Sequence, residues 1–219
     1  MQNLFGAVIT GDIEHSTQLN PQDRSAMLPT LQRALALPAN WQPYWQSNIF
    51  QGDSFQGYTL QKPQDALGVA LWIWLHLKSQ HLAARIAIAL GTVSLNTGST
   101  LTSDGEAFRL SGRLLGTLKQ QNQLLGIQAG NLEFNAEWQV HSLTADYLMQ
   151  RTSPLQAEAM QSQLSGLTQQ QAAAALGISQ PAIAQRLQAA AWPLWQALLN
   201  RFQQQGLLLF QTSQGKPTP

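Results

Sequence analysis

The sequence predicts an α+β domain followed by an all-α domain, and three features of the chain carry this prediction. Short apolar runs ended by glycine, typical of buried strands, alternate with segments of helical periodicity over about the first 130 residues. Beyond them the sequence is helical in pattern and rich in Ala, Gln and Leu. The charge balance also changes, from ten Asp/Glu against eight Lys/Arg up to Gln150 to one against four from Arg151 onward. These shifts predict two domains, residues 1–132 and 133–219.

The composition excludes several classes of protein. Of the 219 residues 44% are hydrophobic and only 11% are charged, which favours a packed core over a disordered chain. The absence of cysteine excludes a disulfide framework and a thiolate metal site. No basic segment followed by an apolar run opens the chain, and the longest apolar stretch, ALGVALWIWLHL, is too short to span a bilayer. We therefore expect a cytoplasmic protein with no membrane partner.

The order of elements predicts the topology of the first domain. Strands are expected at residues 4–10, on both sides of a turn within 48–61, at 84–95 and at 124–130; helices are expected at 21–37, 63–80 and 104–121. The order β-α-β-β-α-β followed by a helix and a last strand matches a ferredoxin-like split βαβ sandwich with its helices on one face of the sheet.

Two aspartates stand where this topology would bring them together. Asp12 and Asp53 each follow a glycine, one after the first strand and the other near the tip of the hairpin. The first strand and the hairpin are neighbours in the middle of the sheet, and two adjacent carboxylates repel unless a proton or a cation lies between them. Oxygen ligands of this kind suit Mg²⁺ or Mn²⁺ together with substrate phosphates. The turn into a helix at Ser16 and Thr17 would offer backbone N–H groups to a polyphosphate.

An alternative for both aspartates stays open at this point. Aspartate before a turn is common as an Asx turn or a helix cap, and Gly-Asp is a favourable turn dipeptide. His15 beside the first aspartate is expected to be a surface residue rather than a ligand.

The motifs around these aspartates resemble those of the class III nucleotide cyclases. GDIEHST and QGDSFQG resemble the two metal-aspartate motifs, RIAIALGTVSL is similar to the strand before the dimer-facing region, and DGEAFRLSGRLL resembles the helix with the transition-state residues. The resemblance implies that Asp12, Asp53 and the backbone of Ile13 hold Mg²⁺ or Mn²⁺ ions. It implies that Arg113 stabilises the leaving phosphates. It also implies a head-to-tail homodimer, in which Arg113 meets the aspartates of the other chain.

The chain departs from the cyclase pattern at the positions that recognise the nucleoside. Arg109, the second candidate catalytic residue, stands where the family has the asparagine that holds the ribose, and Ile49 stands where it has the lysine that selects the base. The partner of that lysine would align near Thr102. A site built to hydrogen-bond a purine loses discrimination when a donor becomes an alkyl chain. The resemblance therefore implies retained metal and phosphate binding but lost adenine recognition.

A narrower resemblance covers nearly the whole chain. The form GDSFQG is similar to the motif of the SatD-like family of bacterial proteins, which combine a cyclase-like N-terminal domain with a C-terminal helix-turn-helix.

The second domain carries a helix-turn-helix pattern between residues 167 and 192. Thr168 and Gln171 form the capping box of one helix, Gly177 permits a turn, and Ser179 caps a second helix with Pro181 in its first turn. The segment resembles the trihelical helix-turn-helix of bacterial regulators, with a supporting helix before it and another after it. The apolar run LLLFQTS near the end is expected to form a short strand.

If this segment binds DNA, the N-terminal end of its second helix enters the major groove. The expected DNA contacts are Ser179, Gln180, Gln185 and Arg186, the last three pointing outward, and the expected phosphate contacts are Arg151, Arg201 and Lys216. So few cations predict weak non-specific binding with a shallow salt dependence. A helix-turn-helix used only for packing or dimerisation is the alternative.

Three functions follow from these patterns. The first is a transcriptional regulator in which a cyclase-like domain that senses a nucleoside triphosphate and a metal is coupled to a helix-turn-helix. The second is a divalent-metal-dependent nucleotidyl cyclase or related phosphoryl-transfer enzyme with altered base specificity. The third is an interaction module whose aspartates are structural.

Overall fold

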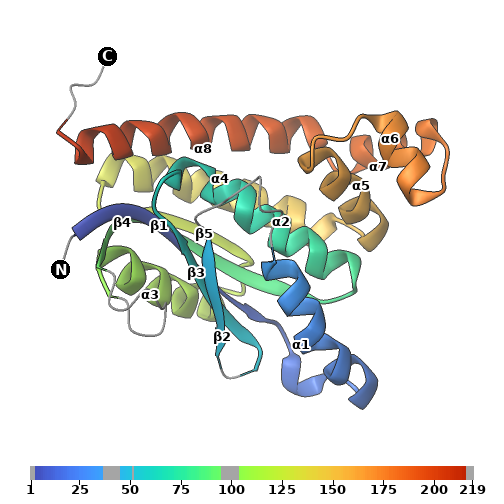
Figure 1. Cartoon of the computed structure of the whole chain (residues 1–219), viewed down its shortest axis with the longest axis horizontal. Coiled ribbons are helices and arrows are strands. Elements are labelled where there is room, and N and C mark those ends of the chain that lie inside the picture. Colours follow the sequence, from blue (N-terminus) through green and yellow to red (C-terminus); the bar gives the residue numbers. More distant parts are fainter. Residues whose placement is uncertain (1–2, 37–44, 51, 95–103, 216–219) are drawn as a thin grey trace.

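The computed structural model describes residues 3–36, 45–50, 52–94 and 104–215 and shows a mixed α+β fold built on a five-stranded sheet (Figure 1). The strands are β1 (Asn3–Ile13), β2 (Gln46–Phe50), β3 (Ser54–Thr59), β4 (Ala84–Ser94) and β5 (Leu125–Ala129). Their order is β2-β3-β1-β4-β5, with β5 parallel to β4 and every other pair antiparallel. The first strand and the hairpin are therefore neighbours, as predicted.

The helices expected in the first 130 residues are present in the predicted order. The helices and 3-10 turns are η1 (Ser16–Gln18), α1 (Pro21–Leu35), η2 (Pro63–Asp65), α2 (Ala66–Ser79), α3 (Glu106–Gln121), α4 (Leu132–Arg151), α5 (Pro154–Leu164), α6 (Gln169–Leu176), α7 (Gln180–Ala189) and α8 (Trp192–Ser213). Most of the predicted bounds lie within about two residues of these. No helix of the described chain is long and apolar enough to cross a membrane.

The prediction that the helices lie on one face of the sheet is wrong. Ile9 of β1 faces the cluster of α1 and α2, whereas its neighbour Val8 packs in the cluster that contains Phe108 of α3. Figure 1 shows α3 on the opposite side of the sheet from α2 and α8. Ala7, Val8 and Ile9 are all fully buried, so this strand is apolar on both faces and both faces need cover.

The expected strand at LLLFQTS is also wrong, because α8 continues through it to Ser213. Gly206 suggests a helix break by sequence, but in the structure it serves a close approach. A Cβ on Gly206 would lie 2.9 Å from the Cα of Gln64 in η2. Beyond it, the ring of Phe210 packs at 6.2 Å from that of Phe5 in β1. The glycine thus lets the helix stay intact while it lies against the sheet.

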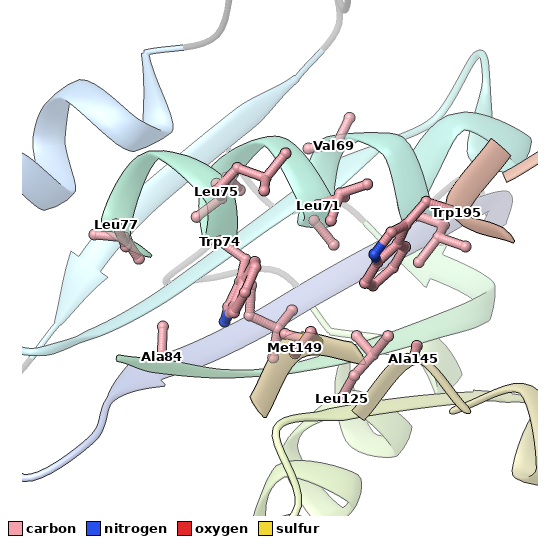
Figure 2. Close-up of a cluster of buried hydrophobic side chains, with 14 of the residues drawn as sticks. Val69, Leu71, Trp74, Leu75, Leu77, Ala84, Leu125, Ala145, Met149 and Trp195 are labelled. Carbon is pink, nitrogen blue, oxygen red and sulfur yellow. The ribbon is translucent and has the colours of Figure 1, made fainter. Parts of the chain in front are cut away.

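One hydrophobic core connects the sheet to the C-terminal helices. Figure 2 shows Trp74 of α2 and Trp195 of α8 above Met149 of α4 and Leu125 of β5. Both indole rings are almost completely buried, and the same cluster extends to Leu187 of α7. The division at residues 132 and 133 stays a prediction, and the shared core shows that the chain on its two sides packs together.

The three-helix unit, α5 to α7, has the local features that the sequence predicted. The hydroxyl of Thr168 accepts the backbone N–H of Gln171, and the Gln171 side chain accepts the N–H of Thr168, so the capping box is present. Gly177 ends α6 with φ 66°, in the left-handed region that favours glycine. Ser179 caps α7, and Ile183, on the inner face of α7, is fully buried.

We expect Trp195→Ala to lower the free energy of unfolding by about 3–5 kcal/mol, because it empties the junction between α2, α8 and the sheet. Trp195→Phe is the matched control. The buried Nε1 of Trp195 has no hydrogen-bond partner among the described residues, so losing it removes no interaction. The phenylalanine variant should lose less than half as much stability. Urea unfolding followed by circular dichroism measures both, and equal losses would contradict this account of the junction.

Candidate functional site

Asp12 lies near the end of β1 and is 6% exposed. Its strand partners are Ser54 on β3 and Arg85 on β4. One carboxylate oxygen, Oδ2, is 2.7 Å from the Nζ of Lys119 at the C-terminal end of α3. The other, Oδ1, is buried 3.7 Å from Nη1 of Arg85, too far for a hydrogen bond, and has no hydrogen-bond partner among the described residues. Half of the carboxylate is therefore unsatisfied.

Asp53 lies in the turn of the hairpin, directly beside the end of β1. Its backbone carbonyl accepts the N–H of Ile13 at 3.0 Å, which joins the two aspartate segments. Its carboxylate accepts the hydroxyl of Ser16 at 2.5 Å and the hydroxyl of Ser54 at 3.2 Å. The fold thus brings four of the predicted residues, Asp12, Ile13, Asp53 and Ser16, to one edge of the sheet.

The two carboxylates have different partners in this arrangement. The Asp12 carboxylate is held by the cations of Lys119 and Arg85, whereas the Asp53 carboxylate is held by hydroxyl groups. Among the described residues, no direct contact joins the two carboxylates. Thr17 is exposed in η1. This 3-10 turn has only three residues, so it offers fewer free N–H groups to a polyphosphate than the expected helix would. His15 is exposed, as expected.

Three further charged residues lie at this edge, and the sequence analysis did not assign them to the site: Arg85, Glu14 and Lys119. The guanidinium of Arg85 is fixed by the carboxylate of Glu14 and by the carbonyl of Gln123 at 2.9 Å. The Lys119 side chain is half exposed, on a helix surface. Arg85 is therefore a fixed part of the site, whereas the ammonium of Lys119 can be displaced.

A divalent cation at this edge would take the place of the Lys119 ammonium at Oδ2 of Asp12. Oδ1 of Asp12 is unsatisfied, and Asp53 is joined by its backbone carbonyl to Ile13, the residue after Asp12. Within the described ranges, no group of three or more His, Cys, Asp or Glu side chains converges as a metal site. The remaining ligands of Mg²⁺ or Mn²⁺ would therefore have to be water and phosphate oxygens, which Mg²⁺ commonly uses.

The two arginines expected to act in catalysis lie away from this edge. Arg109 pairs with Asp104 at 2.8 Å on the surface. Arg113 is exposed and lines a groove of about 690 Å³ between α3, β5 and α4. Ile49 lies in β2 opposite Phe55, and Thr102 lies outside the described residues. Within one chain, Arg113 therefore does not complete the aspartate site.

A second cavity, of about 430 Å³, lies between α2, α5 and α8. The cavity is lined by Lys62 and Asp65, which precede α2, and by Gln163 and Trp192 of the C-terminal helices. Burial raises the pKa of Asp65. The cavity is thus a polar gap at the junction of the two halves of the chain.

The side chains expected to contact DNA differ in whether they are already engaged within the chain. Gln185 is exposed, Gln180 donates to the side chain of Gln169 at 2.7 Å, and Ser179 caps its own helix. Arg186 does not point outward as predicted. Its guanidinium turns onto α5, where it contacts the Leu155 carbonyl and forms an ion pair with the Glu158 carboxylate.

The expected phosphate contacts are also engaged. The guanidinium of Arg151 lies over the ring of Tyr147 at 4.3 Å. Arg201 binds both carboxylate oxygens of Glu137, and these hydrogen bonds lower the pKa of Glu137 to about 2, which keeps the pair ionised at neutral pH. Lys216 lies outside the described residues.

Comparison with known proteins gives a distant likeness of fold. No protein-family model and no curated protein matches the chain. Among solved structures, a bacterial light-regulated adenylyl cyclase is 19% identical with a TM-score of 0.44, over 58% of this chain and 77% of that chain. An EAL/GGDEF domain protein from M. capsulatus is 17% identical (TM-score 0.36, 54% and 77%), and an adenylate/guanylate cyclase/hydrolase from Silicibacter pomeroyi is 20% identical (0.36, 53% and 71%). Likenesses this weak carry no argument about function, and membership of the SatD-like family stays a prediction.

We expect Lys119→Met to bind Mn²⁺ about tenfold more tightly than the unchanged protein, because the cation no longer competes with an ammonium for Asp12. At a fixed Mn²⁺ concentration well above the dissociation constant this adds about 1.4 kcal/mol of stabilisation. The measurement is the shift in melting temperature across a Mn²⁺ titration, compared with Lys78→Met on α2. An unchanged Mn²⁺ response in Lys119→Met would show that no divalent cation binds at Asp12.

Proposed function

We propose that the protein is a transcriptional regulator in which α6 and α7 bind DNA and the edge at Asp12 and Asp53 senses a nucleoside triphosphate together with a divalent cation. The observation that carries this proposal is the geometry of the α6–turn–α7 pair. Only residues 177–179 separate the two helices, with Gly177 in the left-handed region and Ser179 as the cap of α7. Short turns of this kind are typical of helix-turn-helix motifs.

The surface of α7 supports a role in reading bases. Ile183 and Leu187 anchor the helix to the core, so its opposite face is presented to solvent. That face carries Gln185, and Gln180 stands at the exposed N-terminal end. A glutamine in the major groove can pair with adenine through two hydrogen bonds.

The arginines of the C-terminal helices are already paired or stacked within the chain, which favours base contacts over phosphate contacts. Arg186 is bound to α5, Arg151 stacks on Tyr147, and Arg201 pairs with Glu137. Phosphate binding would then depend mainly on backbone N–H groups, which keeps the non-specific affinity low and its salt dependence shallow.

Helix α8 is the physical connection between the two halves. It begins directly after α7 and, as Figure 1 shows, runs back along the sheet to the N-terminal end of β1. There Phe210 packs on Phe5, in the same strand that carries Asp12 near its other end. A change at the aspartate edge can therefore act on the three-helix unit through packed elements rather than through a flexible linker.

The sensing site would use the aspartates for the metal and the following turn for phosphate. Asp12, Asp53 and the backbone of Ile13 would hold Mg²⁺ or Mn²⁺, with Ser16 and Thr17 close to the phosphates. A cation bound there would neutralise phosphate charge.

To test DNA binding, the full chain is used to select ligands from a randomised duplex library, and Gln185→Ala is measured on the selected duplexes by fluorescence anisotropy. We expect this variant to lose about 1–3 kcal/mol of binding free energy at the selected sites. Gln120→Ala, an exposed glutamine on α3, should bind like the unchanged chain. If no duplex is enriched, or both variants bind equally well, the DNA-binding proposal fails.

A second candidate function is a metal-dependent nucleotidyl cyclase or related phosphoryl-transfer enzyme with altered base specificity. The observation that favours it is the unsatisfied, buried Oδ1 of Asp12, in a segment whose next residue, Ile13, is hydrogen-bonded to the backbone of Asp53. Arg113 does not reach this site in its own chain, so it would have to act on the site of a partner chain.

For this candidate we expect pyrophosphate release from one of the four nucleoside triphosphates in the presence of Mn²⁺. Asp12→Asn should abolish the release, because a neutral amide cannot hold the cation, whereas Asp23→Asn on the surface of α1 should leave it unchanged. If the unchanged protein releases no pyrophosphate, the enzyme candidate is excluded while the regulator proposal still stands.

A further inference from the structure

Helix α4 is apolar on two of its faces, and only one of them is covered by the rest of the described chain. Phe134, Trp138 and Met149 are buried against the core. The other apolar face, here called the exposed stripe of α4, consists of Leu132, Ala136, Val140, Leu143 and Tyr147. Among these, Leu132 is 87% exposed, Val140 62%, Tyr147 57% and Leu143 49%. Contiguous apolar surface of this kind marks an interaction site more often than single exposed residues do.

The spacing of the stripe is that of a helix-packing seam. Its members follow one another at intervals of four, four, three and four residues, which keeps them within one narrow sector of a 3.6-residue helix. Steps of three and four residues are the pattern by which two helices pack side by side. The occupant that this spacing fits best is therefore another helix.

We infer that the exposed stripe of α4 is the contact surface between two copies of this chain, which pack with their α4 helices antiparallel about a two-fold axis. The axis passes between Val140 and Leu143. It sets Val140 of one copy opposite Leu143 of the other, and Ala136 opposite Tyr147, so that a small side chain meets a large one. A surface that is complementary to itself in this way is what a two-fold interface requires.

The charges at the ends of α4 select the antiparallel orientation. Glu133 and Arg151 are both exposed and lie 18 residues apart, which is five turns of a helix, so they stand on the same edge of the stripe. In an antiparallel pair, Glu133 of each copy faces Arg151 of the other. In a parallel pair the two copies of Glu133 would lie at one end of the interface and the two copies of Arg151 at the other, with no opposite charges at the same level. The stacking of Arg151 on Tyr147 holds its guanidinium at the end of the stripe.

The same charges make a membrane a poor occupant. Helix α4 carries Glu133, Glu137 and Asp146 against Arg151 as its only Lys or Arg. Helices that lie on anionic membranes instead have lysine- and arginine-rich polar faces. A second copy supplies opposite charge at both ends, which an anionic lipid surface does not.

This interface differs from the head-to-tail dimer that the cyclase resemblance implies, since that dimer brings Arg113 of α3 to the aspartates of the other chain. It does not depend on the proposed function. An α4 dimer would carry two α7 helices related by a two-fold axis, the symmetry with which helix-turn-helix dimers meet palindromic sites.

The test measures the mass of the full chain by light scattering and sedimentation, at concentrations from roughly 1 to 100 µM. We expect twice the chain mass of 24.0 kDa. The double variant Val140→Glu, Leu143→Glu should be a monomer. Leu28→Glu, which alters a 41% exposed leucine on α1, is the matched control and should stay a dimer. Circular dichroism and melting temperature establish that each variant is folded. A monomeric unchanged protein, or a double variant that still forms a dimer, would overturn the proposal.

A charge exchange tests the orientation separately. Glu133→Arg should weaken the dimer at least tenfold, because it sets two cations against each other at both ends. Adding Arg151→Glu to it should restore the affinity, since the opposite charges then meet again. If the second substitution gives no recovery, the antiparallel arrangement is wrong.

Discussion

The structure depends on one constraint: the central strands β1 and β4 are apolar on both faces. From Ala84 to Gly91 every residue of β4 is buried, and so is most of β1. A sheet of this kind cannot leave either face to water, because each exposed apolar face would forgo its hydrophobic stabilisation. Helix α3 covers one face, and α1, α2, α4 and α8 cover the other (Figure 1). The candidate site and the connection to the three-helix unit both follow from this double cover.

The cover by α3 is what creates the electrostatics at Asp12. The even-numbered residues of β1 face this helix: Val8 in the apolar cluster, Thr10 bonded to Ser111, and Asp12 beside Lys119. A carboxylate that is 6% exposed needs positive charge nearby, since burial without it carries a large desolvation penalty. Lys119 and Arg85 supply that charge, but they leave Oδ1 unsatisfied. In the proposed sensing site, a divalent ion would replace one of these cations, the displaceable ammonium of Lys119.

The cover by α8 is what connects the C-terminal helices to the sheet. Trp195 fills the space between α2, β5 and α4 (Figure 2). Gly206 lets the helix lie directly against η2. The three-helix unit is therefore attached through a continuous hydrophobic core. Helix α4 takes part in that core with one face only, which leaves its second apolar face available for a partner.

The sequence by itself determined the order of strands and helices in the first 130 residues and the local chemistry of several turns. Apolar runs, helical periodicity and caps such as Thr168 and Ser179 act over a few residues, so they could be read without a structure. The neighbourhood of Asp12 and Asp53 could also be predicted, because it follows from strand order alone. Only the tertiary structure decided which face α3 covers, that Lys119 and Arg85 reach Asp12, and that Arg186 turns onto α5. Those outcomes depend on strand register and on packing between residues remote in the chain. The energies of these long-range contacts determine them, and a local sequence pattern does not report those energies. The same reason explains Gly206: a glycine that looks like a helix break in the sequence is a contact point once α8 meets η2.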